Sequence, residues 1–295
     1  MVSVIITTHK RSPEVLRRAV DSVLGQTLKA GEIFVIDDAP EYERHGEIVQ
    51  LVQEYGGAVQ YHVNTRRVGA CASRNDGIRM ASGEIIALLD DDDEWLPDKL
   101  ETLVPKLTDD VGLVYGRYEI INPKRNLIVH RGMDIYEGSV YDNLLLHGNF
   151  IGGCSVPVMQ KRAILDAGMF DEELKSAQDY DLWLRIAKHW RVSFVDRPVL
   201  KYYISGDAIS ASPQRKLDSE ARLLRKYAAD YERLPEAKRR MVRQTVYYLT
   251  ANGERKKARA YYQANRAFLS GKEYALLTIK GVLKRILLRT KLQNR

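Results

Sequence analysis

An apolar run that ends in four consecutive aspartates is the feature that most constrains how this chain can fold. Residues 85–89 are all aliphatic, and residues 90–93 are all aspartate. Adjacent carboxylates repel one another, and a compact chain tolerates them only where cations or hydrogen-bond donors offset the repulsion. A buried strand that delivers them to the end of a sheet makes an oxygen-rich seat suited to Mg²⁺ or Mn²⁺. The alternative is a solvated acidic turn before a helix that begins near Pro97.

Strand and helix patterns alternate through the first part of the chain. Strands are predicted at residues 2–8, 32–36, 58–63, 84–89 and 111–116, and helices at 12–24, 46–55, 70–80 and 98–107. Such β-α-β repeats with short connections predict an α/β fold with a mostly parallel sheet flanked by helices. Ligands bind beyond the carboxyl ends of the strands in these sheets. Polar clusters at residues 7–9, 37–38 and 90–93 all fall at such ends.

The remaining sequence is less regular and then becomes basic and helical. Residues 148–155 form a predicted flexible loop of small residues, and helices are expected at 159–167 and 176–190. Four helical segments follow, at residues 217–231, 236–250, 254–268 and 274–288. We therefore expect an α/β domain of residues 1–212 and a basic α-helical extension of residues 213–295.

Charge is distributed unevenly between these two parts. Residues 213–295 hold 22 of the 46 Lys and Arg residues but only 7 of the 39 Asp and Glu residues. A basic segment of this kind can attract an anionic membrane, a nucleic acid or an acidic partner. Within residues 274–291, apolar side chains recur at helical spacing with basic ones between them, which suits a helix lying on a membrane surface. Packing against the protein's own body or a partner is the alternative.

Two cysteines, Cys71 and Cys154, make neither a disulfide framework nor a zinc site. The sequence shows no signal-peptide pattern and no apolar stretch of the length that spans a bilayer. We therefore expect a cytoplasmic protein, with peripheral attachment to the inner face of the cell membrane as an option.

Six segments, in order, resemble signatures of the family-2 glycosyltransferases, which are inverting enzymes of GT-A fold that use nucleotide-sugars. The resemblance covers roughly residues 1–210. Its segments are residues 2–11, 22–27, 32–38, 64–78, 90–93 and 178–185. The last of these, Gln-Asp-Tyr-Asp-Leu-Trp-Leu-Arg, is similar to the acidic motif that supplies the family's catalytic base.

The resemblance implies a role for each matching residue. Asp179 would be the catalytic base, and Asp92 would bind the Mn²⁺ or Mg²⁺ ion. The nucleotide-sugar, with UDP as the commonest nucleotide, would be held by Thr8, His9, Asp38, Arg74, Asp90 and Asp91. Gly153, Cys154, Ser155 and Trp183 would approach the donor or the acceptor. The acceptor would be a glycan or a lipid-linked sugar, in surface polysaccharide or lipopolysaccharide synthesis.

Several of these residues also have ordinary structural readings. Asp179 could simply cap a helix, Trp183 could be a core aromatic, and Asp38 could close a turn. The chain also departs from the family pattern, because Gln178 replaces the usual Glu and Ser205 stands where many members have His.

Two other functions stand as alternatives to sugar transfer. A metal-dependent nucleotidyltransferase would normally carry a glycine-rich loop after the first strand, and residues 7–12 contain no glycine. A nucleic-acid-binding protein would use the basic extension, but no known binding motif accompanies it, so nucleic acid is not expected as a partner.

Overall fold

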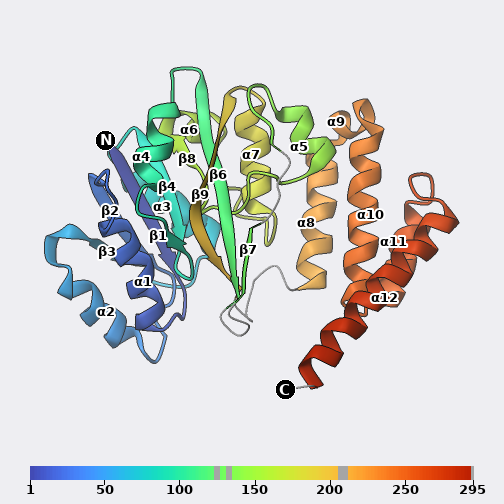
Figure 1. Ribbon diagram of the computed structural model, residues 1–295, viewed down its shortest axis with the longest axis horizontal. Helices are drawn as coiled ribbons and strands as arrows, with labels where there is room; N and C mark the ends of the chain where they lie inside the picture. Colours follow the sequence, from blue (N-terminus) through green and yellow to red (C-terminus); the bar gives the residue numbers. More distant parts are fainter. Residues whose placement is uncertain (123–126, 131–134, 205–211, 294–295) are drawn as a thin grey trace. The chain divides into compact units, whose positions relative to one another are not determined.

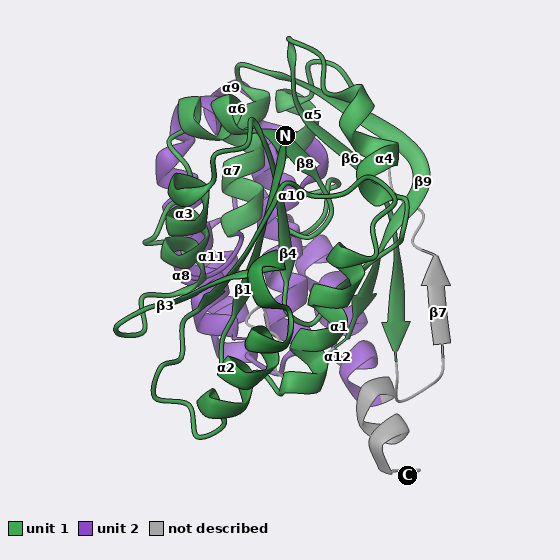
Figure 2. Ribbon diagram, turned by 90° about the vertical axis from the view of Figure 1, so that its left-hand side faces the viewer, with its two compact units in different colours: residues 1–144, 149–174, 178–208 green, residues 145–148, 175–177, 209–295 purple. Residues whose placement is uncertain are grey.

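The computed structural model describes residues 1–122, 127–130, 135–204 and 212–293, with the backbone alone at 127–130 and 287–293. The chain divides into two compact units. Unit 1 comprises residues 1–144, 149–174 and 178–208, and unit 2 comprises residues 145–148, 175–177 and 209–295 (Figure 2). The sequence position of Ser205, where the family often has His, lies outside the described residues.

Within the residues just given, nine strands form one sheet in unit 1 (Figure 1). Their order is β3-β2-β1-β4-β8-β6-β9-β5, and β7 pairs with β6 beside this path. The strands are β1 (Val2–Thr8), β2 (Glu32–Asp37), β3 (Gln60–Val63), β4 (Ile85–Asp90), β5 (Glu94–Trp95), β6 (Val111–Asn122), β7 (Leu127–His130), β8 (Val158–Gln160) and β9 (Arg191–Tyr203).

The predicted parallel sheet is found in β3, β2, β1 and β4, which are all parallel to their neighbours. The other half is mixed, because β8 runs antiparallel to both β4 and β6. β8 also corrects the expected helix at residues 159–167: the chain first forms a strand, and the helix α6 begins only at Lys161. Val158 and Met159 are fully buried between two neighbouring strands, a tertiary setting that overrides local helical preference.

The helices of unit 1 largely follow the predicted positions. They are α1 (Pro13–Leu24), α2 (His45–Glu54), α3 (Ala70–Met80), α4 (Lys99–Leu103), α5 (Tyr141–His147), α6 (Lys161–Asp166) and α7 (Gln178–Ala187), with 3₁₀ turns at Gly56–Ala58 and Val104–Lys106. The division by contacts assigns the end of α5 to unit 2. α1 shows why these sequences form amphipathic helices: its buried residues Leu16, Ala19, Val20 and Val23 recur at a spacing of three to four.

Unit 2 consists mainly of α8 (Pro213–Lys226), α9 (Ala228–Arg233), α10 (Pro235–Ala251), α11 (Arg255–Ala264) and α12 (Gly271–Gln293). Val242, Val246 and Leu269 form its hydrophobic cluster. α12 approaches α10 closely at Gly281, where an added Cβ would lie 2.8 Å from the Cβ of Thr250. No helix in the described part of the chain is both long and apolar enough to span a membrane.

Candidate active site

Strand register brings the three predicted polar clusters to one edge of the sheet. Thr7 of β1 pairs with Asp90 of β4, and Thr8 pairs with Asp37 of β2. The backbone N–H of Asp38 then donates to the Thr8 carbonyl at 2.9 Å. Since β1 lies between β2 and β4, the ends of all three strands form one continuous rim.

The four aspartates alternate between the rim and the interior. The side chains of Asp90 and Asp92 are 36% and 23% exposed, whereas that of Asp91 is 6% exposed and Asp93 is buried. The run is therefore a two-sided turn, with two carboxylates available to a ligand and two held by the protein. The alternative interpretation, a fully solvated acidic turn, does not describe this arrangement.

Arg11 offsets part of the negative charge of this turn. Its Nε donates to Asp91 at 2.9 Å and its Nη2 donates to Asp92 at 3.1 Å. Burial, reinforced by the charge of Asp92, raises the pKa of Asp91 to about 6, although Arg11 acts in the opposite direction. Burial and the neighbouring charge of Asp90 raise the pKa of Asp93 well above its usual value. Burial thus opposes the ionisation of both inner carboxylates, while Arg11 favours that of Asp91.

A buried lysine ties the acidic turn to the predicted donor loop. Lys99 has no exposed surface, and its ammonium group donates to the backbone carbonyls of Ser155, at 2.8 Å, and Val156. Burial lowers the pKa of Lys99 well below its usual value, with Asp93 acting in the opposite direction. The Ser155 hydroxyl in turn accepts the backbone N–H of Asp90 at 3.0 Å. Ser155 is thus buried between the turn and Lys99.

Arg74 projects from α3 beneath this rim. Its Nη2 donates to Asp90 at 2.6 Å, and its guanidinium lies over the ring of Phe170 with 5.5 Å to the centroid. Its Nε and Nη1 are buried without a hydrogen-bond partner in the structure. Although burial acts to lower it, the electrostatic influence of Cys154 and Asp90 raises the pKa of Arg74, so the side chain stays charged. A buried cation with two unused donor atoms is suited to binding an anion.

Asp38 is buried, and its carboxylate accepts several hydrogen bonds from within the protein. Its carboxylate accepts from the Asn64 amide at 2.9 Å and from the backbone N–H groups of Val68, at 2.7 Å, and Gly69, at 2.8 Å. These bonds fix the loop that leads into α3. Asp37, and not Asp38, closes the turn after β2, by accepting the backbone N–H of Ala39 at 2.9 Å. The proposed contact of Asp38 with a nucleobase stays a prediction.

Thr8 and His9 connect the end of β1 to both neighbouring clusters. The Thr8 hydroxyl acts to lower the pKa of the Asp91 carboxylate. The His9 backbone N–H donates to Asp91 at 3.3 Å, and its ring Nδ1 lies 3.0 Å from the Asp38 carbonyl. Lys10 then adopts a φ of 52°, in the left-handed region that non-glycine residues rarely occupy. The chain therefore turns sharply as it leaves the rim.

Asp179 lies in the first turn of α7, and its carboxylate accepts the Asn149 amide at 3.1 Å. Burial raises the pKa of Asp179, and Asp90 adds to this, while the Tyr180 N–H and Arg74 act to lower it. Asp181 is fully buried and pairs with Arg185 at 2.7 Å, so its role is structural. Burial, and not a second carboxylate on the same helix, is what raises the pKa of the candidate base.

The predicted loop is built on Trp183 and glycine. Trp183 is fully buried, and its Nε1 donates to the Gly152 carbonyl at 3.0 Å, so in this structure the ring supports the loop from behind. Gly152 has a φ of 102°, and a Cβ there would lie 3.0 Å from Val156. Gly153 is exposed, whereas Cys154 is buried and burial raises the pKa of its thiol. Among these residues, Gly153 is therefore the one presented to solvent.

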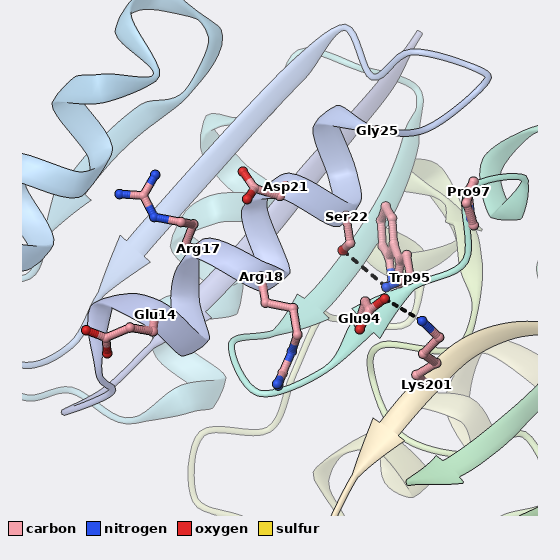
Figure 3. Close-up of a pocket in the computed structure, with 10 residues that line it drawn as sticks. All are labelled: Glu14, Arg17, Arg18, Asp21, Ser22, Gly25, Glu94, Trp95, Pro97 and Lys201. Carbon is pink, nitrogen blue, oxygen red and sulfur yellow. Dashed lines mark hydrogen bonds and ion pairs between the residues drawn. The ribbon is translucent and has the colours of Figure 1, made fainter. Parts of the chain in front are cut away.

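A separate pocket of about 500 Å³ lies behind the acidic turn, between α1 and β5 (Figure 3). It is lined by residues of both charges, among them Arg18, Glu94 and Lys201, and the last two form an ion pair at 2.6 Å. Arg18 also donates to the backbone carbonyl of Asp92 at 2.6 Å and stacks 3.7 Å from the centroid of the Tyr203 ring. Arg18 of α1 thus links the acidic turn to Tyr203 of β9.

Sequence reasoning did not single out several residues on which the site depends. Arg11 lies within the matching segment 2–11 and Asn149 within the predicted loop 148–155, but neither was given a role, and Lys99 lies in a predicted helix without any motif. Asp90 and Asp92 remain the rim carboxylates that could hold a divalent cation. No group of three or more His, Cys, Asp or Glu residues converges as a ready-made metal cage in the part of the chain that is described.

Comparison with known proteins identifies a family whose sequence model this chain matches. Residues 3–167 match the sequence model of "Glycosyl transferase family 2", which is more than half of the chain. The chain is 31% identical over 209 residues to an uncharacterized glycosyltransferase of Rickettsia conorii, covering 68% of this chain and 33% of that protein. It thus spans about a third of the length of that relative.

Two relatives from Escherichia coli carry more specific names. One is the UDP-Glc:alpha-D-GlcNAc-diphosphoundecaprenol beta-1,3-glucosyltransferase WfgD, 30% identical over 220 residues, with 74% of this chain and 82% of that protein covered. The other is WcaA of strain K12, a putative colanic acid biosynthesis glycosyl transferase, 28% identical over 245 residues, with 79% and 83% covered.

Proposed function

The chain belongs to glycosyl transferase family 2, and from this premise we propose that it transfers a sugar with inversion from a nucleotide-diphosphate sugar to a hydroxyl group. The fold is of the GT-A type and the protein is a glycosyltransferase enzyme. For the donor we propose a UDP-sugar, and for the acceptor a glycan or a lipid-linked sugar of surface polysaccharide synthesis. The name of WfgD supports the choice of a UDP-sugar and of a lipid-linked acceptor, and that of WcaA supports a role in polysaccharide synthesis.

The observation that carries this proposal is the electrostatic coupling of three groups from different elements. Arg74 of α3 pairs with Asp90 of β4 at 2.6 Å, and the pKa of Asp179 on α7 responds to both charges. Inverting transfer needs a base on one side of the anomeric carbon and charge neutralisation on the leaving-group side. A basic carboxylate and an anion-binding arginine that share one small region supply these two requirements.

Asp179 is proposed to take the proton from the acceptor hydroxyl. A carboxylate is most effective as a base when its pKa is raised toward the working pH, and burial shifts Asp179 in that direction. Asn149 donates to one carboxylate oxygen and leaves Asp179 further lone pairs with which to accept the hydroxyl proton.

Arg74 and Arg11 are proposed to hold the diphosphate. Arg74 carries two buried donor atoms without a partner, and Arg11 donates both to Asp92 on the rim and to the inner Asp91. Guanidinium groups bind phosphate oxygens in fixed, often paired geometry.

Asp92, with Asp90 beside it, is proposed to bind Mn²⁺ or Mg²⁺. Both side chains are partly exposed on the rim, and their hard oxygen atoms are the donors that these ions prefer. Such ions commonly take one or two carboxylates and complete their shell with phosphate oxygens and water, so the donor set fits. When bound, the ion would neutralise charge on the departing nucleotide diphosphate.

A panel of nucleotide diphosphates, screened by thermal shift with and without Mn²⁺, tests the donor proposal. We expect a stabilisation by UDP that requires the metal and is lost in Asp92→Asn. Asp179→Asn should keep the UDP response and lose sugar transfer. Asp166→Asn, an exposed residue of α6, is the matched control. If Asp92→Asn retained both turnover and nucleotide affinity, the assignment of the rim would be wrong.

We also propose that α12 attaches the enzyme to an anionic bilayer. Leu276, Ile279, Leu283 and Ile286 are each between 49% and 57% exposed, and Lys280 and Lys284 lie between them in sequence. The predicted side chains at 287–291 lie outside the described residues. Flotation with anionic liposomes, with and without residues 270–295, tests this. Equal flotation of both proteins at low salt would reject it.

A further inference from the structure

Unit 2 contains a pocket of its own that none of the roles above uses. Its volume is about 620 Å³, and it is lined by residues of α10, by Leu146 and His147 of α5 and by Leu277 of α12. All of these residues belong to unit 2. The volume falls within the range of about 300–1,000 Å³ that is usual for sites of small organic ligands.

Three arginines of α10 contribute to the lining: Arg239, Arg240 and Arg243. Arg239 and Arg243 both donate to the carboxylate of Glu273, the former at 3.0 Å. The Ser270 backbone N–H, followed by Arg239, holds the pKa of Glu273 at about 2, so this carboxylate is ionised at physiological pH. Glu273 therefore positions two guanidinium groups in advance, which reduces the entropic cost of binding a ligand.

The arginines keep capacity for a further anion. Each guanidinium has five N–H donors, more than the contacts to Glu273 use. The side chains of Arg239 and Arg243 are each 42% exposed. Arg240 donates to Gln244 at 2.9 Å and to the Leu145 carbonyl at 3.3 Å. Phosphate, like carboxylate, is an anion whose geometry suits clustered, pre-positioned guanidinium groups.

The rest of the lining is part polar, from His147, Glu236 and Gln244, and part apolar. Glu236 is a second carboxylate partner of Arg239, at 3.6 Å. Leu146, Tyr247 and Leu277 supply hydrocarbon and aromatic surface next to the arginines. The residue beside Leu277, Leu276, begins the exposed apolar stripe of α12. At 100° per residue, Lys280 and Lys284 fall on the helix surface between that stripe and Leu277. A ligand suited to this surface has an acidic head and a long hydrocarbon tail.

We propose that this pocket binds the phosphate or diphosphate head and the first hydrocarbon units of the lipid that carries the acceptor sugar. The inference deepens, and rests on, the proposed function. The arginines recognise the head, and Leu146, Tyr247 and Leu277 contact the chain. A lipid-linked acceptor would thus be bound by unit 2, independently of the nucleotide and of the divalent cation.

Equilibrium binding of farnesyl diphosphate to the full chain, measured by calorimetry in EDTA, tests this proposal. Inorganic pyrophosphate and farnesol are the comparison ligands. We expect farnesyl diphosphate to bind at least tenfold more tightly than either, because it alone combines both features. Equal binding of pyrophosphate would mean that only a charge is recognised, and equal binding of farnesol that only an apolar surface is; either overturns the proposal.

Substitutions of the lining residues test whether farnesyl diphosphate binds in this pocket. Arg239→Gln and Arg243→Gln should each weaken farnesyl diphosphate about tenfold, the value of roughly one charge-assisted hydrogen bond. Arg259→Gln, an exposed arginine of α11 outside the pocket, should leave it unchanged. Asp92→Asn should also leave it unchanged, which separates this pocket from the nucleotide rim. Unchanged affinity in both pocket variants would refute the assignment.

Folding and the donor site are monitored in the same samples. Each arginine variant keeps the other arginine on Glu273, and a melting curve checks that it folds. Should a variant fail to fold, protection of the wild-type arginines by farnesyl diphosphate against phenylglyoxal replaces it, and absence of protection refutes the proposal. A metal-dependent UDP response without farnesyl diphosphate binding would reject this inference alone. Loss of the UDP response would instead reject the proposed function.

Discussion

Lys99 donates from its ammonium nitrogen to the backbone carbonyl of Ser155 at 2.8 Å, although its side chain has no exposed surface. The same carbonyl accepts the indole N–H of Trp95 at 3.1 Å. Lys99 and Trp95 come from the segment that follows the acidic turn, and Ser155 from the predicted donor loop. One carbonyl group thus joins two parts of the candidate active site that are about sixty residues apart.

Replacing Lys99 by Met should destabilise the protein. The substitution removes a buried donor from the Val156 carbonyl and from the Ser155 carbonyl, which keeps the indole N–H of Trp95, and this should cost about 3 kcal/mol of unfolding free energy. Urea denaturation followed by circular dichroism measures this. Lys106→Met, an exposed lysine shortly after α4, should change the unfolding free energy by less than about 0.5 kcal/mol. Equal stability of the two variants would refute the role of Lys99.

Replacing Arg74 by Met should weaken binding of the nucleotide diphosphate by about 10- to 100-fold. The expected loss corresponds to about 1.5–3 kcal/mol for a charge-assisted hydrogen bond. The matched control is Arg79→Met on the same helix, because Arg79 is 52% exposed and pairs with Asp76 one turn away. Calorimetry with UDP and Mn²⁺ compares the two. Similar losses in both variants would mean that α3 responds to any change of charge.

Replacing Asn149 by Asp should shift the pH dependence of sugar transfer. A carboxylate in place of the amide removes a donor to Asp179 and adds a like charge, and both raise the pKa of Asp179 further. A base must be deprotonated to act, so the acid limb of the profile of kcat/KM against pH should move to higher pH. Asn149→Ser, which loses the donor without adding charge, should move it less. A limb that stays in place would show that Asp179 is not the group being titrated.

Replacing Glu220 by Gln should alter how stability depends on pH. Glu220 is buried in unit 2, where Thr245 and Tyr261 donate to it, and burial raises its pKa above the usual 4.5. Above pH 4.5 the unfolded chain releases this proton before the folded one does. The contribution of Glu220 to stability is therefore present at low pH and decreases as the pH rises through the folded-state pKa.

The measurement is urea denaturation of the wild type and Glu220→Gln between pH 4.5 and pH 8. Relative to the wild type, the variant should gain stability as the pH rises, because Gln cannot ionise. A difference in unfolding free energy between the two proteins that stays constant across this range would contradict the prediction. It would show that the pKa of Glu220 is the same in the folded and the unfolded chain.

Elements with strong periodicity could be predicted from the sequence, and those that depend on a distant partner could not. β1 at Val2–Thr8 and α3 at Ala70–Met80 lie where the pattern placed them. The helix expected from residue 159 was wrong at its start, because Val158–Gln160 pairs with β4 and β6. The long β9, Arg191–Tyr203, was not predicted, and its pairing with β6 contains three irregularities of register.

The candidate site shows the same limit. The order of strands and helices was enough to predict that residues 8–9, 38 and 90–93 lie on one rim. The reason is that the carboxyl ends of parallel strands lie at the same edge of a sheet. This order could not show that Asp38 is occupied by the loop before α3, or that Trp183 lies wholly inside the protein. These facts depend on which backbone groups need partners once the chain is folded, and spacing does not carry that information.

The alternation of the four aspartates has a consequence for how a diphosphate approaches. A doubly phosphorylated anion does not encounter a wall of four negative groups, since every second one points inward and is at least partly masked. Each of the two that face outward, Asp90 and Asp92, accepts a hydrogen bond from a guanidinium group. The acidic turn therefore repels an approaching diphosphate far less than four adjacent aspartates suggest. This holds even before a divalent cation binds to the two outer carboxylates.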